Sequence, residues 1–308
     1  MLRWINWLVV FCPTLIWLAF ALRDVSWWTE NIVAFPSLFL VSYLVFALVF
    51  SLFRQWAHAI SCLMFSVVFW LLTPVSQQKL TSECANPIRV GQFNTFYGNS
   101  DINQVLNFLL SQELDLVVLQ EVAPEVGERL KTLSDVYPFQ YGGQTGVGYP
   151  SSQMILSQTE LTNMSVFMTP DQQAVIKGNW RPSKHQAFTL ITAHPPSPRS
   201  KELWYRRNAL IRTIASLTVE YPNDETLIVG DFNLSSVSLR YSKLFPEFQS
   251  APVASWPKWS VDVKTPAWTM ISIDHLWLKS TERKICQRQS LDTPNGSDHK
   301  FVLTQIGY

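Results

Sequence analysis

The sequence predicts an α/β domain that follows an all-α membrane segment of three helices. Three long runs near the amino terminus carry no ionised side chain, and the remaining chain alternates strand-like apolar runs with segments of helical spacing. The 308 residues are 47% hydrophobic and only 15% charged, which is little charge for a water-soluble protein. We therefore divide the chain into a membrane anchor, residues 1–80, and a second domain, residues 81–308.

The three uncharged runs are residues 4–22, 32–53 and 57–75. Each is close to the ~20 residues that a helix needs to cross a bilayer. Water is absent from the bilayer core, so the backbone must satisfy its own hydrogen bonds, and helices do this even where proline interrupts them. The first run also resembles a cleavable signal peptide, but it is longer than the usual apolar core of ~7–15 residues, which favours an uncleaved anchor.

The orientation in the membrane depends on the charges beside the three runs. Basic residues in the short flanking segments are divided equally, with Arg3 and Arg54 on one side and Arg23 and Lys79 on the other. The signal-like character of the first run places the amino terminus inside. We therefore expect an integral protein of the bacterial inner membrane whose second domain lies outside the cytoplasm.

The four cysteines are split between the two parts of the chain. Cys12 and Cys62 lie in the membrane runs, where they serve packing. Cys84 and Cys286 lie in the second domain, and an extracytoplasmic compartment would permit a disulfide between them. Two buried free thiols are an equal alternative. No CxxC or HExxH pattern occurs, so the common zinc signatures are missing.

The second domain alternates strands and helices. The run 114–122 is almost continuously apolar, as expected for a strand covered on both faces. Interleaving of this kind predicts layers packed around central sheets. The expected elements are strands at 88–94, 114–122, 186–194, 226–233, 271–278, 283–291 and 297–307, helices after residue 101 and over 199–220, a turn-rich stretch at 141–152 and a looser region at 237–270.

Polar residues stand at or near the ends of these strands. Each group alone is typical of a solvated strand end, but six groups together are not. Carboxylates gathered on one rim raise each other's pKa unless a cation lies among them. Oxygen donors favour a hard ion such as Mg²⁺ or Mn²⁺, and the histidines suit proton transfer or charge stabilisation. The groups are Asn94, Glu121, His194, Asp231 with Asn233, Asp274, and Ser297-Asp298-His299.

Taken in order, QFN, LQEV, TAH, GDFN, SIDH and GSDH resemble the motifs of the endonuclease/exonuclease/phosphatase superfamily, whose type member is pancreatic deoxyribonuclease. The resemblance runs from about residue 88 to 306. It implies a two-sheet α/β sandwich flanked by helices, with the active site where strand ends of both sheets meet. It also implies metal-dependent hydrolysis of phosphate esters.

The resemblance assigns three residues to the metal, which would be Mg²⁺ or Mn²⁺. Glu121 matches the main metal ligand of the family. Asn94 and Asp298 match residues that complete or orient the shell of the ion.

The resemblance assigns five residues to catalysis. Asp231 would orient or deprotonate the attacking water, and Asn233 would hold a phosphate oxygen. Asp274 would fix the imidazole of His299, while His194 would touch the phosphate or assist the leaving group. Either Asp231 or His299 remains open as the general base.

The chain also departs from the family pattern. Residues 152–157, SQMILS, lack the Gly-Asn or Gly-Ala pair that many members carry before "ILS". Tyr149 is an uncertain match to the tyrosine that some nucleases place near the phosphate. The segment 266–275, PAWTMISIDH, lacks the arginine that is usual in inositol phosphatases, which disfavours that activity.

Two clusters bear on the substrate. The basic residues just after His194 fit either phosphate contacts or the solvated face of a helix. The tryptophans of the looser region fit base stacking, a lip at the bilayer surface, or core packing. The basic cluster is Arg199, Lys201, Arg206, Arg207 and Arg212, and the tryptophan cluster is Trp256, Trp259 and Trp268.

Three functions follow from these observations. The leading one is a membrane-anchored, divalent-metal-dependent phosphodiesterase, with a nuclease as one candidate. The second is a lipid- or inositol-phosphate headgroup phosphatase or phosphodiesterase. The third is a catalytically retired, membrane-tethered scaffold, which the complete set of acids disfavours. The expected partners are a phosphate-ester substrate, either nucleic acid or a lipid headgroup, and the lipid bilayer through the amino-terminal helices.

Overall fold

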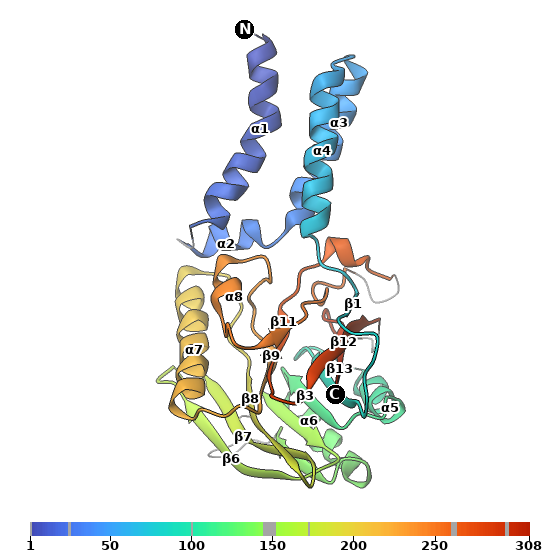
Figure 1. Cartoon of the computed structure of the whole chain (residues 1–308), viewed down its shortest axis with the longest axis vertical. Helices are drawn as coiled ribbons and strands as arrows, with labels where there is room; N and C mark the ends of the chain where they lie inside the picture. The colour runs from blue at the N-terminus through green and yellow to red at the C-terminus, as the bar shows by residue number, and fades with distance from the viewer. Residues whose placement is uncertain are drawn as a thin grey trace.

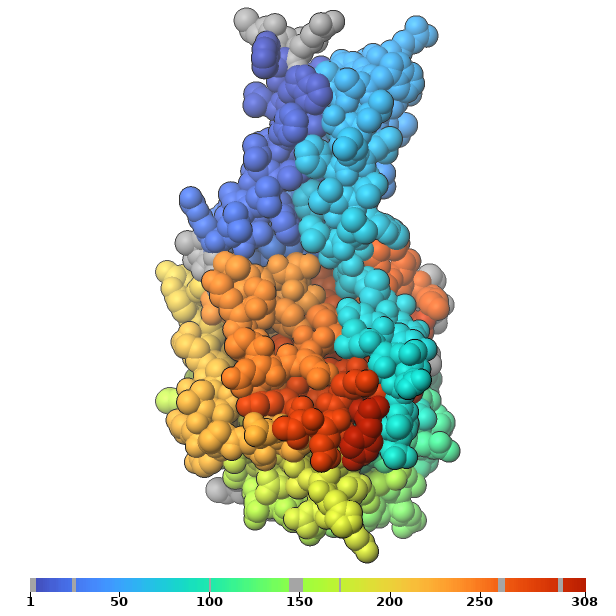
Figure 2. Space-filling model, in the orientation of Figure 1, coloured from blue at the N-terminus to red at the C-terminus, as the bar shows by residue number. Residues whose placement is uncertain are grey.

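Three helices project from one end of a domain built of two β-sheets (Figure 1). The computed structural model describes residues 2–23, 26–99, 101–143, 152–171, 173–259, 264–292 and 296–308. Helices α1 (Leu2–Ala21), α3 (Pro36–Leu52) and α4 (Trp56–Leu72) form the projection, and the short helix α2 (Trp27–Val33) lies at its base. The projection is narrower than the domain below it (Figure 2).

The amino-terminal segment forms four helices, because the short helix α2, which contains Glu30, lies mostly before the predicted run 32–53 and precedes α3. Helix α1 is long and apolar enough to cross a membrane over Trp4–Ala21, while α4 is a shorter apolar helix of 17 residues. The predicted run 32–53 is broken, because α2 and α3 meet at an angle of 59°. Pro36 occupies the first turn of α3, and the residue before a proline avoids the helical region. The chain therefore breaks between α2 and α3 and does not form one continuous helix.

The strands form two mixed sheets. The seven-stranded sheet has the order β1 (Gln77–Lys79), β12 (Lys284–Leu291), β13 (Phe301–Gly307), β2 (Ile88–Asn94), β3 (Leu116–Gln120), β5 (Gln153–Ser157), β4 (Phe139–Gly142). The six-stranded sheet has the order β10 (Gln249–Ser250), β11 (Asp274–Lys279), β9 (Thr226–Asp231), β8 (Gln186–Ala193), β7 (Ala174–Ser183), β6 (Leu161–Met168). Strand β1 lies before residue 81, so the sheet begins within the segment assigned to the anchor.

The sheets face each other, and helices cover their outer faces. Along β3, Leu116 and Val118 point into the core between the sheets, while Val117 and Leu119 pack under the outer helices. This alternation explains why the strand is apolar throughout. Helices α5 (Ile102–Ser111) and α6 (Pro124–Leu130) cover one sheet, and α7 (Lys201–Glu220) and α8 (Leu239–Lys243) cover the other. The predicted two-sheet sandwich flanked by helices is confirmed.

Cys84 and Cys286 form a disulfide that ties the segment before β2 to β12, across 202 residues of chain. A bond that closes so long a loop restricts the unfolded chain, so we expect its removal to lower the free energy of unfolding by about 2–4 kcal/mol. Thermal unfolding in detergent should show the loss in a Cys84→Ala/Cys286→Ala variant and in reduced wild type. Cys12→Ala, at an exposed free cysteine, is the control. Equal stability of oxidised wild type and double variant would contradict the expectation.

Candidate active site

Polar side chains from both sheets meet where neighbouring parallel strands end. Strands β2 and β3 are parallel, so Asn94, the last residue of β2, and Glu121, the residue after β3, lie at the same edge. Strands β8 and β9 are also parallel, and they bring His194 and Asp231 to the corresponding edge of the second sheet.

The antiparallel strands complete the same edge. Asp274 opens β11 directly opposite Asp231 in the register of the six-stranded sheet. Strand β13 pairs antiparallel with β2, with Val302 opposite Gln92, so the segment that precedes β13 returns to the carboxyl end of β2. This topology delivers His299 to the site.

Asn94 links the two sheets. Its Nδ2 donates to Glu121 Oε1 at 3.1 Å and to Asp231 Oδ2 at 3.0 Å, while its Oδ1 accepts from the backbone N–H of Phe96 at 3.0 Å. The side chain is almost completely buried. The amide oxygen of Asn94 is already engaged by the backbone N–H of Phe96. The amide nitrogen is therefore the part of the side chain that acts on the site, and it orients the two carboxylates.

Two of the site residues have left-handed backbone conformations. Glu121 has φ 52° and Asn233 has φ 49°, which costs a residue other than glycine some energy. The backbone carbonyl of Glu121 accepts from Thr95 Oγ1 at 2.9 Å, and the N–H of Asn233 donates to Asp231 Oδ1 at 2.9 Å. These bonds hold the strained residues in place.

His194 faces two carboxylates. Its Nε2 lies 3.5 Å from Asp231 Oδ2 and 3.7 Å from Glu121 Oε1. Burial lowers the pKa of His194, but the hydrogen bond and charge of Asp231 outweigh burial and raise that pKa overall. Asn233 Nδ2 lies 3.4 Å from the same ring nitrogen and donates to Pro195 O at 3.0 Å.

Asp274 and His299 form a buried pair. Asp274 Oδ2 lies 2.8 Å from His299 Nδ1, and His299 Nε2 lies 3.7 Å from Asp231 Oδ2. Burial works against protonation of the imidazole, but the charges of Asp274 and Asp231 prevail and raise the pKa of His299 to about 10. The pKa of Asp231 falls to about 2, because bonds and charges from His194 and His299 overcome its burial. The imidazolium of His299 therefore lies between two carboxylates.

The pair rests on buried residues that the sequence interpretation missed. Arg288 is fully buried, and its Nη2 donates to Gln92 Oε1 at 3.1 Å and to the carbonyl of Asp274 at 2.9 Å. Gln92 Nε2 in turn donates to Asp274 Oδ1 at 3.2 Å. The sequence did contain a signal for Arg288, because it is a charged residue within a predicted strand of a domain with few charges. In the structure its side chain points inward.

Two serines fix the loops at the same edge. Ser255 Oγ accepts from the backbone N–H of Asp274 at 3.2 Å. Ser297 Oγ donates to the carbonyl of Asn94 at 2.7 Å and accepts from the N–H of His299 at 3.0 Å. The segments before β11 and β13 are thus tied to this edge of the sheets by single hydroxyl groups.

Asp298 is held by a tryptophan. Trp256 Nε1 donates to its Oδ2 at 2.8 Å, and its backbone carbonyl accepts from Lys258 N at 2.6 Å. Within the described part of the chain, the second carboxylate oxygen of Asp298 accepts no hydrogen bond. That oxygen remains available to a ligand.

The donor set fits a hard divalent cation. One amide draws together the carboxylates of Glu121 and Asp231, and Asp298 offers a further oxygen. Asp231, Asp274 and His299 also present ligand atoms within 4.8 Å of one another. In that group Asp274 and His299 are bonded to each other, and neither Glu121 nor Asp298 belongs to it. Their oxygen donors are the ligand type that Mg²⁺ and Mn²⁺ prefer.

The residues of the basic cluster separate in space. Arg206 Nε pairs with Asp171 Oδ2 at 2.5 Å, whereas Arg207 is buried beside Asn233. Lys201 and Arg212 are exposed on α7, and Arg199 is exposed before it.

The tryptophan cluster also separates. Trp256 holds Asp298, as described above, and Trp268 packs near Trp70 of α4 with ring centroids 6.1 Å apart. Trp259 is 66% exposed. Tyr149 lies outside the described residues.

Solved structures with this fold include proteins of several activities. The D. rerio TDP2 complexed with a single-strand DNA product shares 14% identity, with a TM-score of 0.60 over 72% of this chain and 100% of that chain. The human Nocturnin catalytic domain with bound sulfate anion shares 15%, with a TM-score of 0.55 over 75% and 96%. Sphingomyelinase C from Streptomyces griseocarneus shares 16%, with a TM-score of 0.54 over 72% and 99%.

These likenesses concern the fold, since identity is low in every case. No curated protein matches the chain by sequence. The family match covers residues 91–299, which include Asn94, Glu121, Asp231 and His299 together with most strands of both sheets. The chain belongs to the Endonuclease/Exonuclease/phosphatase family.

Proposed function

We propose that the protein is a membrane-anchored, divalent-metal-dependent phosphoesterase that hydrolyses phosphodiester bonds. The observation that carries this proposal is the hydrogen bonding of Asn94 to both Glu121 and Asp231, beside the Asp274–His299 pair. Phosphodiester hydrolysis requires an oriented water and donors for the charge that develops on the phosphate oxygens. This edge of the domain supplies both kinds of group.

Glu121 and Asp298 would hold Mg²⁺ or Mn²⁺, with Asn94 orienting the carboxylate of Glu121. When bound, the ion neutralises negative charge on the phosphate oxygens. Glu121 is suited to this role because its side chain is partly exposed, at 22%, whereas Asp231 is buried.

The remaining residues would act on water and phosphate. Asp231 accepts a hydrogen bond from the attacking water and takes its proton. Asn233 and His194 hold a non-bridging phosphate oxygen, which their 3.4 Å separation permits. Asp274 fixes His299 through Nδ1, so that Nε2 is the nitrogen presented to the reaction.

The projecting helices would anchor the protein in a bilayer. Among the described residues, 40 large apolar side chains are exposed, and 28 of them belong to residues 4–75. Exposing so many neighbouring apolar side chains to water is unfavourable. We propose that the catalytic domain lies outside the cytoplasm of a bacterial cell. The disulfide between Cys84 and Cys286 supports this side, because disulfides persist in oxidising compartments.

Nucleic acids and lipid headgroups both contain the phosphodiester bond that this chemistry requires. The shared fold of the TDP2 complex with DNA supports a nuclease, and that of sphingomyelinase C supports a headgroup hydrolase.

Chelation tests the proposed function. Purified full-length protein should hydrolyse bis(p-nitrophenyl) phosphate with Mg²⁺ or Mn²⁺, lose activity to background in EDTA, and regain it when the metal is restored, because Glu121 and Asp298 alone cannot neutralise the phosphate. Activity that persists in EDTA would contradict the metal requirement. No turnover of this diester, of DNA, of RNA or of phospholipid would instead favour a retired, membrane-tethered scaffold.

A further inference from the structure

The segment that joins the membrane helices lies against the active-site end of the domain. We call residues 27–36, helix α2 and the turn into α3, the elbow. Asn31 Nδ2 donates to the carbonyl of Pro198 at 2.9 Å. Ala34 packs in one apolar cluster with Ile271 and Ile273, to which Phe35 and Trp256 also belong. The elbow therefore contacts the loops that carry His194 and Asp274.

A buried ion pair links the elbow to a catalytic residue. Glu30 is 8% exposed, and its Oε2 accepts from Arg207 Nη2 at 2.7 Å and from Trp204 Nε1 at 2.6 Å. Arg207 Nη1 donates to the carbonyl of Asn233 at 2.9 Å, next to the strained backbone of that residue. A buried ion pair is costly to desolvate, and it stabilises the fold little more than apolar packing of the same residues would. The main effect of this pair is therefore to fix the position of α2 relative to Asn233. The elbow is thus fastened to the site, whereas a simple tether would need no such contact.

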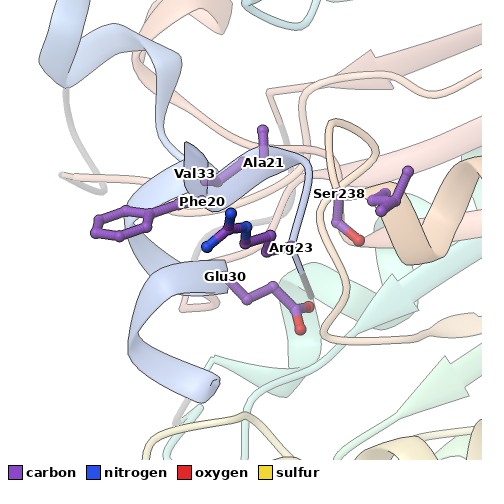
Figure 3. A pocket seen from close by; sticks show the side chains of 7 residues that line it. Phe20, Ala21, Arg23, Glu30, Val33 and Ser238 are labelled. Carbon is purple, nitrogen blue, oxygen red and sulfur yellow. The ribbon is translucent and has the colours of Figure 1, made fainter. Parts of the chain in front are cut away.

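A cavity of about 210 Å³ lies between the elbow and the site. Polar groups of Asn31, Arg199 and Asn233 line one part of it, and Phe35 and Trp256 line an apolar part. The cavity is smaller than the pockets of ~300–1,000 Å³ that hold drug-sized ligands. Its volume therefore suits a smaller group, such as a lipid headgroup. On the other side of Glu30, the hollow near Arg23 and Ser238 measures only about 10 Å³, room for about one water (Figure 3).

The charge of the cavity suits an anion. Glu30 and Arg207 neutralise each other, and Arg199 is exposed and forms no ion pair with any residue that the structure describes. A phosphate ester placed in the cavity would meet this guanidinium, and Asn233 lines the same cavity.

Tryptophans lie where the projecting helices meet the domain. Trp268 packs into the cluster of the projecting helices, and Trp259 and Trp28 expose 66% and 47% of their surface. Indole rings gather where hydrocarbon meets headgroups. Two of the three tryptophans of the cluster are not free for base stacking, because Trp256 is bonded to Asp298 and Trp268 packs against Trp70 of α4.

We propose that the elbow forms one wall of the substrate cleft, and that the substrate is a phospholipid headgroup ester whose apolar part remains in the bilayer. The proposal rests on the phosphoesterase function proposed above and names its substrate class. Water adds its oxygen to phosphorus, one P–O ester bond breaks, and the leaving oxygen takes a proton. The lipid approaches along the projecting helices and places its headgroup between the elbow and Asn233.

Wild-type full-length protein in mixed micelles with Mn²⁺ provides the first test. Phospholipids with choline, ethanolamine, glycerol and inositol phosphate headgroups are compared with their deacylated glycerophosphodiesters and with single-stranded DNA. We expect kcat/KM to be at least tenfold higher for one of the lipids than for its deacylated form. Turnover of DNA or of deacylated compounds with no preference for lipid would overturn the proposal while preserving the phosphoesterase function. Failure of every substrate, bis(p-nitrophenyl) phosphate included, would refute the function itself.

A matched pair of variants tests the elbow directly. Ala34→Phe places a large side chain in the wall, while Ile32→Phe makes a similar change on the same segment, outside the cavity. We expect Ala34→Phe to lower the ratio of lipid to bis(p-nitrophenyl) phosphate turnover at least tenfold, and Ile32→Phe to leave the wild-type ratio. Equal ratios in both variants would overturn the proposal. If thermal unfolding shows that Ala34→Phe does not fold, the wild-type comparison decides.

Discussion

Replacing Glu121 with alanine should reduce kcat/KM for phosphodiester hydrolysis by about 10³-fold or more. The carboxylate is partly exposed and is held toward the site by Asn94, which makes it the side chain best placed to hold a cation. A bound ion contributes several kcal/mol of charge stabilisation in the transition state, and about 4 kcal/mol corresponds to a factor of ~10³ in rate. Steady-state kinetics at saturating Mn²⁺ measure the loss.

Metal binding supplies a readout that does not depend on turnover. Titration of Mn²⁺ by calorimetry should show weaker binding to Glu121→Ala than to wild type. Glu125→Ala is the matched control, because Glu125 carries the same charge nearby on the exposed side of α6. A Glu121→Ala protein that binds Mn²⁺ and turns over like the control would show that the ion is held elsewhere.

The edge that carries these residues could be predicted because it follows from strand geometry. Apolar runs that end in Asn94, Glu121 and Asp231 become parallel neighbours in pairs, and parallel strands deliver their carboxyl ends to one edge. Which hydrogen bonds form among the side chains could not be predicted. That Asn94 engages both carboxylates depends on how the two sheets face each other, which no local pattern records.

Strands β6 and β7 escaped prediction for a physical reason. They lie at the edge of the six-stranded sheet, and β6 is only partly buried along its length. A register shift interrupts the pairing of β6 with β7 between Thr162 and Ser165, and another interrupts the pairing of β7 with β8 between Trp180 and Ser183. Each shift turns the following side chains to the other face, so the alternation that identifies a strand is lost.

The contact between the elbow and the site could not be predicted from the sequence either. Glu30 and Arg207 are 177 residues apart, and nothing near either residue indicates its partner. From the sequence, Arg206 and Arg207 both fit either phosphate contacts or the solvated face of a helix. The helical turn of α7 separates them, so that Arg207 points to Asn233 and Arg206 to Asp171. The break before Pro36 is what frees α2 to bring Glu30 to the domain.

Replacing His299 with alanine should lower kcat by about 10²–10⁴-fold, the range that a positioned proton-transfer group contributes. Asp274 engages Nδ1 of the imidazole, so the variant removes the Nε2 that His299 presents to the reaction and leaves Asp274 buried without the imidazole. His185→Ala, at an exposed histidine in the turn between β7 and β8, is the matched control and should turn over like wild type. A His299→Ala enzyme within tenfold of wild type would remove His299 from the mechanism.

The same variant should change how stability depends on pH in the metal-free protein. The folded protein keeps the His299 proton up to about pH 10, whereas the unfolded chain loses it near 6.5, its ordinary pKa. The stability that this proton contributes is therefore complete below pH 6.5 and declines as pH rises toward 10, by at most about 1.4 kcal/mol per pH unit. Unfolding in EDTA between pH 6 and 10 should show a steeper decline in wild type and in His185→Ala than in His299→Ala, where only the raised pKa of His194 still contributes. An unchanged slope in His299→Ala would mean that Asp274 and Asp231 do not hold a proton on this imidazole, and the charge arrangement at the centre of the proposed mechanism would be wrong.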